Sequence, residues 1–123
     1  MTSRIRYESI EFHGEGSAEA AIVRDEPAEL LYVPIAASMY SDNLEWAQGL
    51  CVRLARHPHA NVRGNAVLGF GHLARRFGRL DRAVVEPLVR DALVDPNPFI
   101  AGQAQSAAED LGHFLGWHLA PEV

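Results

Sequence analysis

The sequence has no lysine, only one cysteine and no long apolar run. With Cys51 alone, no intramolecular disulfide can form, which agrees with a reducing compartment. No stretch approaches the roughly 18 consecutive apolar residues of a membrane-spanning helix, and the amino terminus lacks the basic patch and apolar core of a signal peptide. We therefore expect a cytoplasmic protein that does not bind a membrane.

What is present is the composition of one globular domain. The 123 residues are 48% hydrophobic and 22% charged, and the formal net charge is −5. The charge is unevenly distributed, because residues 1–50 sum to −6, residues 51–82 to +6 and residues 83–123 to −5. A basic band thus lies between two acidic segments. Either neighbouring helices neutralise one another, or a partner meets opposite signs on different faces.

From about residue 42 onward, apolar residues recur at spacings of three and four, which predicts four amphipathic helices. Asp42 with Glu45 predicts a capped start for the first, Gly78 a left-handed end for the second, and Asn97 a capped start for the fourth. The connections are short, so neighbouring helices should run antiparallel. The four apolar stripes are Leu44, Ala47, Cys51, Leu54 and Ala55; Val62, Ala66, Gly69, Phe70, Leu73 and Phe77; Val84, Val85, Leu88, Val89, Ala92 and Leu93; and Ile100, Ala104, Ala107, Ala108, Leu111 and Leu115.

The segment upstream of these helices is less regular. Residues 27–40 are apolar enough for a further helix that would cover the first unit, and Pro34 inside it predicts a kink or a break. Residues 4–12 alternate in part and precede a glycine-containing turn, which indicates a small extended or strand-like segment. For residues 17–24 the pattern leaves a second strand and a short helix open.

An internal repeat becomes visible when the sequence is shifted by 38 residues against itself. The matches fall on core and turn positions. A helical pair that recurs at this period cannot bury its apolar face alone and stacks on its neighbour. The aligned pairs are Leu50 with Leu88, Pro58 with Pro96, Val62 with Ile100, Gly64 with Gly102, Ala66 with Ala104 and Leu73 with Leu111.

Two stretches of this repeat resemble a known family. Residues 57–66, HPHANVRGNA, are similar to the turn and second-helix start of a HEAT repeat, roughly DPxxxVRxxA, with His57 in place of the aspartate. Residues 95–104, DPNPFIAGQA, are also similar, with Ala101 in place of the arginine. The resemblance covers about residues 42–117. It implies an all-α fold, a short HEAT-like helical-repeat stack of about five helices.

The same resemblance implies how the chain is organised. In the family, Arg63 and Asp95 would join a polar ladder between adjacent turns, a structural role. We expect a single domain, residues 1–123, which contains an amino-terminal extension (1–26), a covering helix (27–40), a first HEAT-like unit (42–78) and a second (80–117).

Candidate catalytic and metal-binding patterns are weak. His57 and His59 form an isolated HxH pair without a second pair at zinc-finger distance. Cys51 lies on an apolar stripe, where a thiol behaves as a small hydrophobe. The adjacent carboxylates Glu109 and Asp110 diverge by about 100° on a helix and do not form an acid–base pair. We expect no catalytic, cofactor or metal residues and no enzyme, although HEAT-type bilin lyases and glycosylases offer an enzymatic comparison.

A surface for another protein remains as the leading hypothesis. In HEAT-like stacks the second helix of each pair lines the concave side, so polar positions of residues 61–78 and 98–117 would share one groove. Mixed charge with histidine suits a specific protein contact. Those positions are His72, Arg75 and Arg76 from one helix and Gln105, Glu109 and His113 from the other.

The sequence is also similar in length and pattern to stand-alone HEAT-like immunity proteins of bacterial polymorphic or contact-dependent toxin systems. That resemblance implies a cognate toxin domain as the partner, neutralised by occlusion of its active site or substrate surface. An acidic chain would suit a basic nuclease toxin, with acidic contacts at Glu8, Glu11, Glu15, Glu19, Glu109 and Asp110. The alternative is a nucleic-acid-binding or scaffold protein that uses the arginine-rich central helices, which the acidic net charge and the scarcity of interleaved aromatic residues disfavour.

Overall fold

The computed structural model describes residues 10–119, and within that range every regular element is a helix. The all-α prediction is therefore confirmed for the described part. Glu8 and most of the predicted extended segment lie outside the described residues. The helices are α2 (Glu15–Arg24), α3 (Pro27–Leu30), α4 (Val33–Tyr40), α5 (Leu44–Leu54), α6 (Ala60–Phe77), α7 (Arg82–Leu93) and α8 (Pro98–Leu115).

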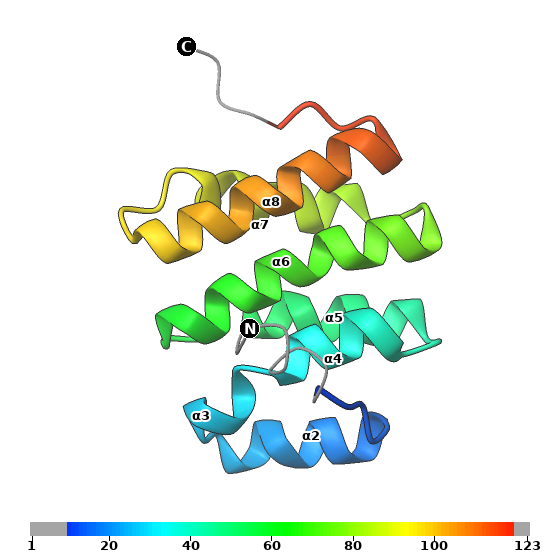
Figure 1. Ribbon diagram of the computed structural model, residues 1–123, viewed down its shortest axis with the longest axis vertical. Helices are drawn as coiled ribbons and strands as arrows, with labels where there is room; N and C mark the ends of the chain where they lie inside the picture. The colour runs from blue at the N-terminus through cyan, green and yellow to red at the C-terminus, as the bar shows by residue number, and fades with distance from the viewer. Residues whose placement is uncertain (1–9, 120–123) are drawn as a thin grey trace, which may run out of the picture.

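The helices are arranged in two layers (Figure 1). In one layer α4, α6 and α8 lie side by side, and α5 and α7 pack behind them. At the lower end, α2 lies along α5. Asn43 Nδ2, before α5, donates to Glu15 Oε2 at 2.8 Å, and Asp25 Oδ1, after α2, lies 2.7 Å from His57 Nε2 beyond the end of α5. The two helices therefore run in the same direction.

The structure decides between the secondary structures that the sequence left open in the amino-terminal part of the described chain. Residues 17–24 belong to a helix, which agrees with their alanine content, and residues 10–14 have no regular structure. Pro34 does interrupt the helix predicted over 27–40: α3 ends at Leu30, and Pro34 lies in the first turn of α4. The break exposes the carbonyl of Leu31, which accepts a hydrogen bond from Asn65 Nδ2 at 2.9 Å.

One predicted cap was wrong by a single position. The side chain of Asn43, not Asp42, caps α5, because its Oδ1 accepts the backbone N–H of Trp46 at 3.1 Å. Gly78 ends α6 with a φ of 69°, and Asn97 caps α8 by accepting from two backbone N–H groups, as predicted.

The 38-residue period reappears in three dimensions. Helices α5 and α7 begin 38 residues apart, as do α6 and α8, and α6 and α8 are each 18 residues long. Gln103 Nε2 on α8 donates to Asn65 Oδ1 on α6 at 2.9 Å, between positions that are also 38 residues apart. The predicted pair of Arg63 and Asp95 is present at 4.0 Å between the turns of the two units.

The core runs the length of the stack between the two layers. The residues of the predicted stripes are buried or partly buried, except Val84, which is exposed on α7. Trp117 and Leu119 follow α8 and are buried, so this segment covers the core at the upper end. Trp117 is therefore part of the packed core.

Two helical glycines give a matched test of how closely α6 and α8 pack. A Cβ on Gly71 would lie 2.9 Å from Asp110 Oδ2 and 3.2 Å from the backbone of Ala107, whereas a Cβ on Gly102 would meet nothing within 4 Å. We expect Gly71→Ala to lower the free energy of unfolding by about 1 kcal/mol or more through overpacking. Gly102→Ala should raise it by about 0.5–1 kcal/mol, because alanine favours helix. Urea unfolding measures both, and a stabilised Gly71→Ala would contradict the close approach.

Candidate partner-binding face

Some of the predicted partner-binding residues lie close together on α6 and α8. Arg75 Nη2 on α6 lies 3.4 Å from Nδ1 of His72 one turn earlier. Asp110 on α8 packs against Gly71, the neighbour of His72. His113 lies one turn beyond Asp110, with its ring edge-on to Phe114 at 4.5 Å between centroids. We call these five residues, His72, Arg75, Asp110, His113 and Phe114, the α6–α8 face.

The α6–α8 face carries one positive and one negative side chain, Arg75 and Asp110. Burial lowers the pKa of His72, and the nearby Arg75 guanidinium lowers it further, while Asp110 acts in the opposite direction. The imidazole is therefore neutral at neutral pH. Neither Arg75 nor Asp110 has an oppositely charged side chain within salt-bridge distance among residues 10–119. The face presents one cation and one anion for which the described part of the chain supplies no partner.

Arg76 does not belong to this face, contrary to the prediction. Its Nη1 donates to the carbonyl of Ser38 and its Nη2 to that of Ser41, both at 2.8 Å, and its guanidinium lies over the ring of Phe77. The last carbonyls of α4 have no partner within their own helix, so Arg76 caps that helix. Its role is structural.

Gln105 and Glu109 on α8, which were also predicted to contact a partner, lie outside the α6–α8 face. Gln105 is exposed but lies about 140° around the helix from Asp110, so it points away from α6. Glu109 is exposed at about 100° from Asp110, beside the α6–α8 face rather than within it. The predicted groove is a surface on which α6 and α8 touch, because a Cβ on Gly64 would meet the ring of Phe99 at 2.7 Å.

The described acidic residues of the amino-terminal set, Glu11, Glu15 and Glu19, lie at the opposite end of the stack, on or just before α2 (Figure 1). Both carboxylate oxygens of Glu19 are hydrogen-bonded within the fold. Arg53 donates to both of them, at 3.0 and 2.6 Å, and Trp46 Nε1 donates at 2.9 Å. The Arg53 hydrogen bonds, then that of Trp46, lower the pKa of Glu19. Glu15 accepts from Asn43, and Glu11 is exposed. Glu11, Glu15 and Glu19 therefore form no single patch with Glu109 and Asp110.

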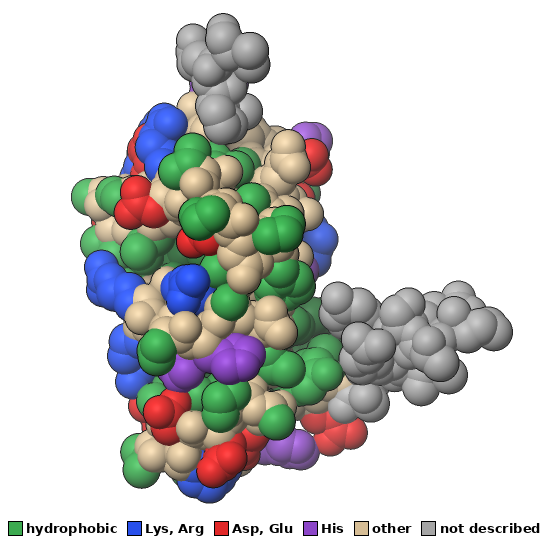
Figure 2. All heavy atoms as spheres, turned by 90° about the vertical axis from the view of Figure 1, so that its left-hand side faces the viewer, with side chains coloured by type: hydrophobic (Ala, Val, Ile, Leu, Met, Phe, Trp, Pro, Cys, Tyr) green, Lys and Arg blue, Asp and Glu red, His purple; other side chains and the backbone are tan. Residues whose placement is uncertain are grey.

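Ion pairs account for most of the basic band. Arg53 on α5 pairs with Glu19 on α2, Arg79 after α6 pairs with Glu45 on α5, and Arg82 pairs with Glu86 within α7. Figure 2 shows the same order on one edge, where basic and histidine side chains lie mainly at mid-height, with acidic side chains above and below. Within residues 51–82, the arginines without a carboxylate partner among the described residues are Arg56 and Arg75. This pairing leaves little of the band for phosphate groups.

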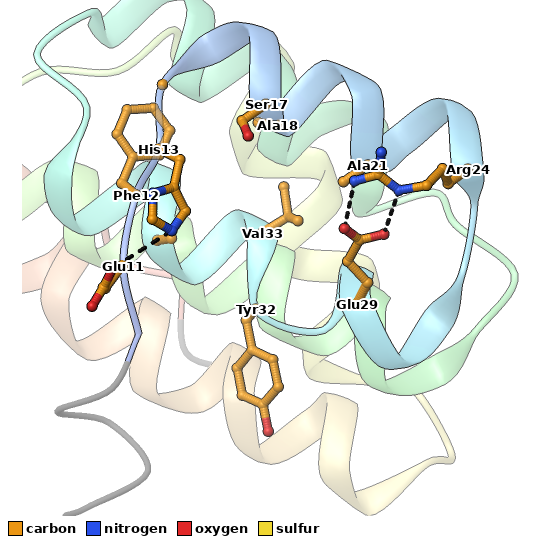
Figure 3. A pocket seen from close by; sticks show the side chains of 12 residues that line it. Glu11, Phe12, His13, Ser17, Ala18, Ala21, Arg24, Glu29, Tyr32 and Val33 are labelled. Carbon is orange, nitrogen blue, oxygen red and sulfur yellow. Dashed lines mark hydrogen bonds and ion pairs between the residues drawn. The ribbon is translucent and has the colours of Figure 1, made fainter.

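Sequence reasoning missed two features. Phe114 and Phe99 are about 40% exposed on α8 although aromatic side chains are usually buried. Phe99 lies off the apolar stripe of α8, which was the available signal. The second is a pocket of about 190 Å³ between residues 11–14, α2 and the α3–α4 break (Figure 3). No sequence pattern places those three segments together.

Histidine and cysteine side chains are considered next, because they are common metal ligands. Within residues 10–119 no group of three or more histidine, cysteine, aspartate or glutamate side chains is arranged to hold a metal ion. His57 pairs with Asp25 and also accepts the backbone N–H of His59. Cys51 is fully buried, and burial raises its pKa to about 12, so its thiol stays protonated at neutral pH.

Comparison with known proteins gives no assignment, since the chain matches no protein-family model, no curated protein and no solved structure. In the part of the chain that the structure describes, no helix combines the length and hydropathy that crossing a membrane requires.

Proposed function

We propose that the protein is a cytoplasmic binding module of HEAT-like architecture that neutralises a cognate bacterial toxin domain. The α6–α8 face is the observation that carries this proposal. Most arginines of the basic band are used within the fold, yet Arg75 and Asp110 lie on one rigid surface with no oppositely charged partner among the described residues. Phe114, which is 39% exposed, adjoins them. Arginine and aromatic residues are enriched where protein interfaces gain most of their affinity.

The HEAT-like assignment is supported by the repeat geometry. Two helical pairs recur at 38 residues with equal second helices, and these second helices form one layer with α4. The contact between Arg63 and Asp95 joins the turns where the family has its polar ladder. A scaffold of this kind presents its second helices as a continuous, concave binding surface.

The mechanism that suits such a surface is occlusion. A rigid helical face covers the active site or the substrate surface of the toxin, and complementary charges set the specificity and the rate of association. The net charge of −5 favours a basic toxin, of which a nuclease domain is the simplest example.

Co-expression tests this function directly. A candidate toxin domain, ideally one encoded immediately upstream of this gene, is expressed in a bacterial host with and without the protein. We expect growth to be restored only when the protein is present, and an unrelated toxin domain of similar size serves as the control. Failure to protect, together with no complex in a pull-down with the toxin domain, would contradict the proposal.

A further inference from the structure

The pocket between α2 and α4 lies far from the α6–α8 face and has the form of an anchor site. Its volume is about 190 Å³, and a cavity of about 150 Å³ with apolar walls is large enough for benzene. One aromatic or branched aliphatic side chain would therefore fit. The apolar lining comes from Phe12, Ala18, Ala21, Val33 and Ala36.

Polar groups stand at the edges of the pocket. In Figure 3, Ser17 on α2 and Val33 on α4 point toward its middle from opposite sides, and Arg24 and Glu29 face each other across one end. Arg24 donates to both oxygens of Glu29, at 3.0 and 2.6 Å. The two charges of this ion pair neutralise each other, so the pair closes the end of the pocket without offering a free charge to a ligand.

The surroundings of the pocket are acidic. Residues 10–30 contain six acidic residues and one arginine, which is already bound to Glu29. Arg53 on α5 pairs with Glu19, and His57 after α5 pairs with Asp25. That leaves three carboxylates with no arginine partner among the described residues: Glu11, Glu15 and Glu26. A partner that approaches this end of the stack therefore meets an apolar recess with Glu11 in its lining, Glu15 at the start of α2 and Glu26 just before α3.

We propose that this pocket receives an apolar side chain of a basic protein, whose flanking lysine or arginine residues meet Glu11, Glu15 and Glu26, and that this protein is the toxin domain, an assignment that rests on the proposed function. The apolar side chain is the anchor, since it leaves water for a preformed recess. The flanking cations provide selectivity and orientation.

Three short peptides test the pocket without any toxin. Lys-Lys-Phe-Lys-Lys carries both features, Lys-Lys-Ser-Lys-Lys lacks the anchor, and Glu-Glu-Phe-Glu-Glu reverses the charge. Titrated against the full chain by NMR, the first should shift the amide signals of Ser17 and Val33 and bind at least about tenfold more tightly than either of the others. Equal binding of the acidic peptide, or shifts confined to other parts of the stack, would overturn the proposal. So would concentration-dependent shifts of the same amides without peptide, because a second copy would then be the occupant.

Matched variants extend the test to the toxin domain. Ser17→Trp fills the pocket, whereas Val23→Trp adds the same ring to α2 at a position that is 84% exposed. Glu11→Arg reverses a charge at the pocket on a segment outside any helix, so it should leave the fold intact, and Asp91→Arg reverses an exposed charge on α7, in the layer behind the α6–α8 face. Ser17→Trp and Glu11→Arg should each weaken toxin binding about tenfold or more, and their controls less than about twofold.

The outcomes separate this inference from the proposed function. If the protein neutralises the toxin equally well with Ser17→Trp and Glu11→Arg, the pocket assignment is wrong and the function stands. If the basic phenylalanine peptide binds at Ser17 but no toxin domain binds, the function is wrong and the pocket remains a site for basic, apolar sequences.

Discussion

Phe70→Ala should lower the free energy of unfolding by about 3–5 kcal/mol, which is much of the stability of a domain of this size. Phe70 is 0% exposed and is the largest fully buried side chain in the described core, on the central helix α6. Removing the ring loses its burial and leaves a cavity that the packed helices on both sides cannot readily close.

Phe114→Ala is the matched control, since Phe114 is 39% exposed on α8. Its removal should change the free energy of unfolding by roughly 0.5 kcal/mol or less. Chemical unfolding followed by circular dichroism measures both variants. Similar losses for the two phenylalanines would mean that α6 is not the centre of the core.

Arg75→Glu should weaken binding of the cognate toxin domain by at least about 30-fold, or roughly 2 kcal/mol. The guanidinium has no carboxylate partner among the described residues, so a partner's acidic group is free to bind it. Reversal of its charge replaces that attraction by repulsion. Because Arg75 is exposed and makes only a long contact with His72, the fold should be unaffected.

Arg56→Glu provides the comparison for this variant. Arg56 is likewise exposed and without a carboxylate partner in the described residues, but it lies after α5, away from the α6–α8 face. Titration calorimetry with the toxin domain should show near-wild-type affinity for Arg56→Glu. Equal losses for the two variants would indicate attraction to net charge rather than contact at the face.

Much of the helical architecture could be predicted because its signals are local. Gly78 and Asn97 mark helix ends through their own backbone and side-chain chemistry, and the apolar spacing needs only neighbouring turns. The pair of Arg63 and Asp95 was expected from the resemblance of these turns to HEAT repeats rather than from the spacing itself. Asp42 was misassigned because Asn43, beside it, is an equally good cap.

The candidate site was predictable only in part, for a physical reason. Helical spacing shows which residues avoid the core, so His72, Arg75 and His113 could be selected. It does not show what lies beside them. Arg76 occupies a polar position, yet α4, more than 30 residues earlier in the sequence, supplies the carbonyls that bind it. The pocket near Ser17 likewise depends on tertiary packing between separate segments.

The most direct test of a toxin-neutralising binding module is an inhibition titration with purified components. The activity of the proposed cognate toxin domain is measured while the protein is added in increasing amounts. We expect activity to fall to background at a molar ratio of one to one, as occlusion of one toxin domain by one copy of the protein requires. Full toxin activity in the presence of excess protein would contradict the central claim.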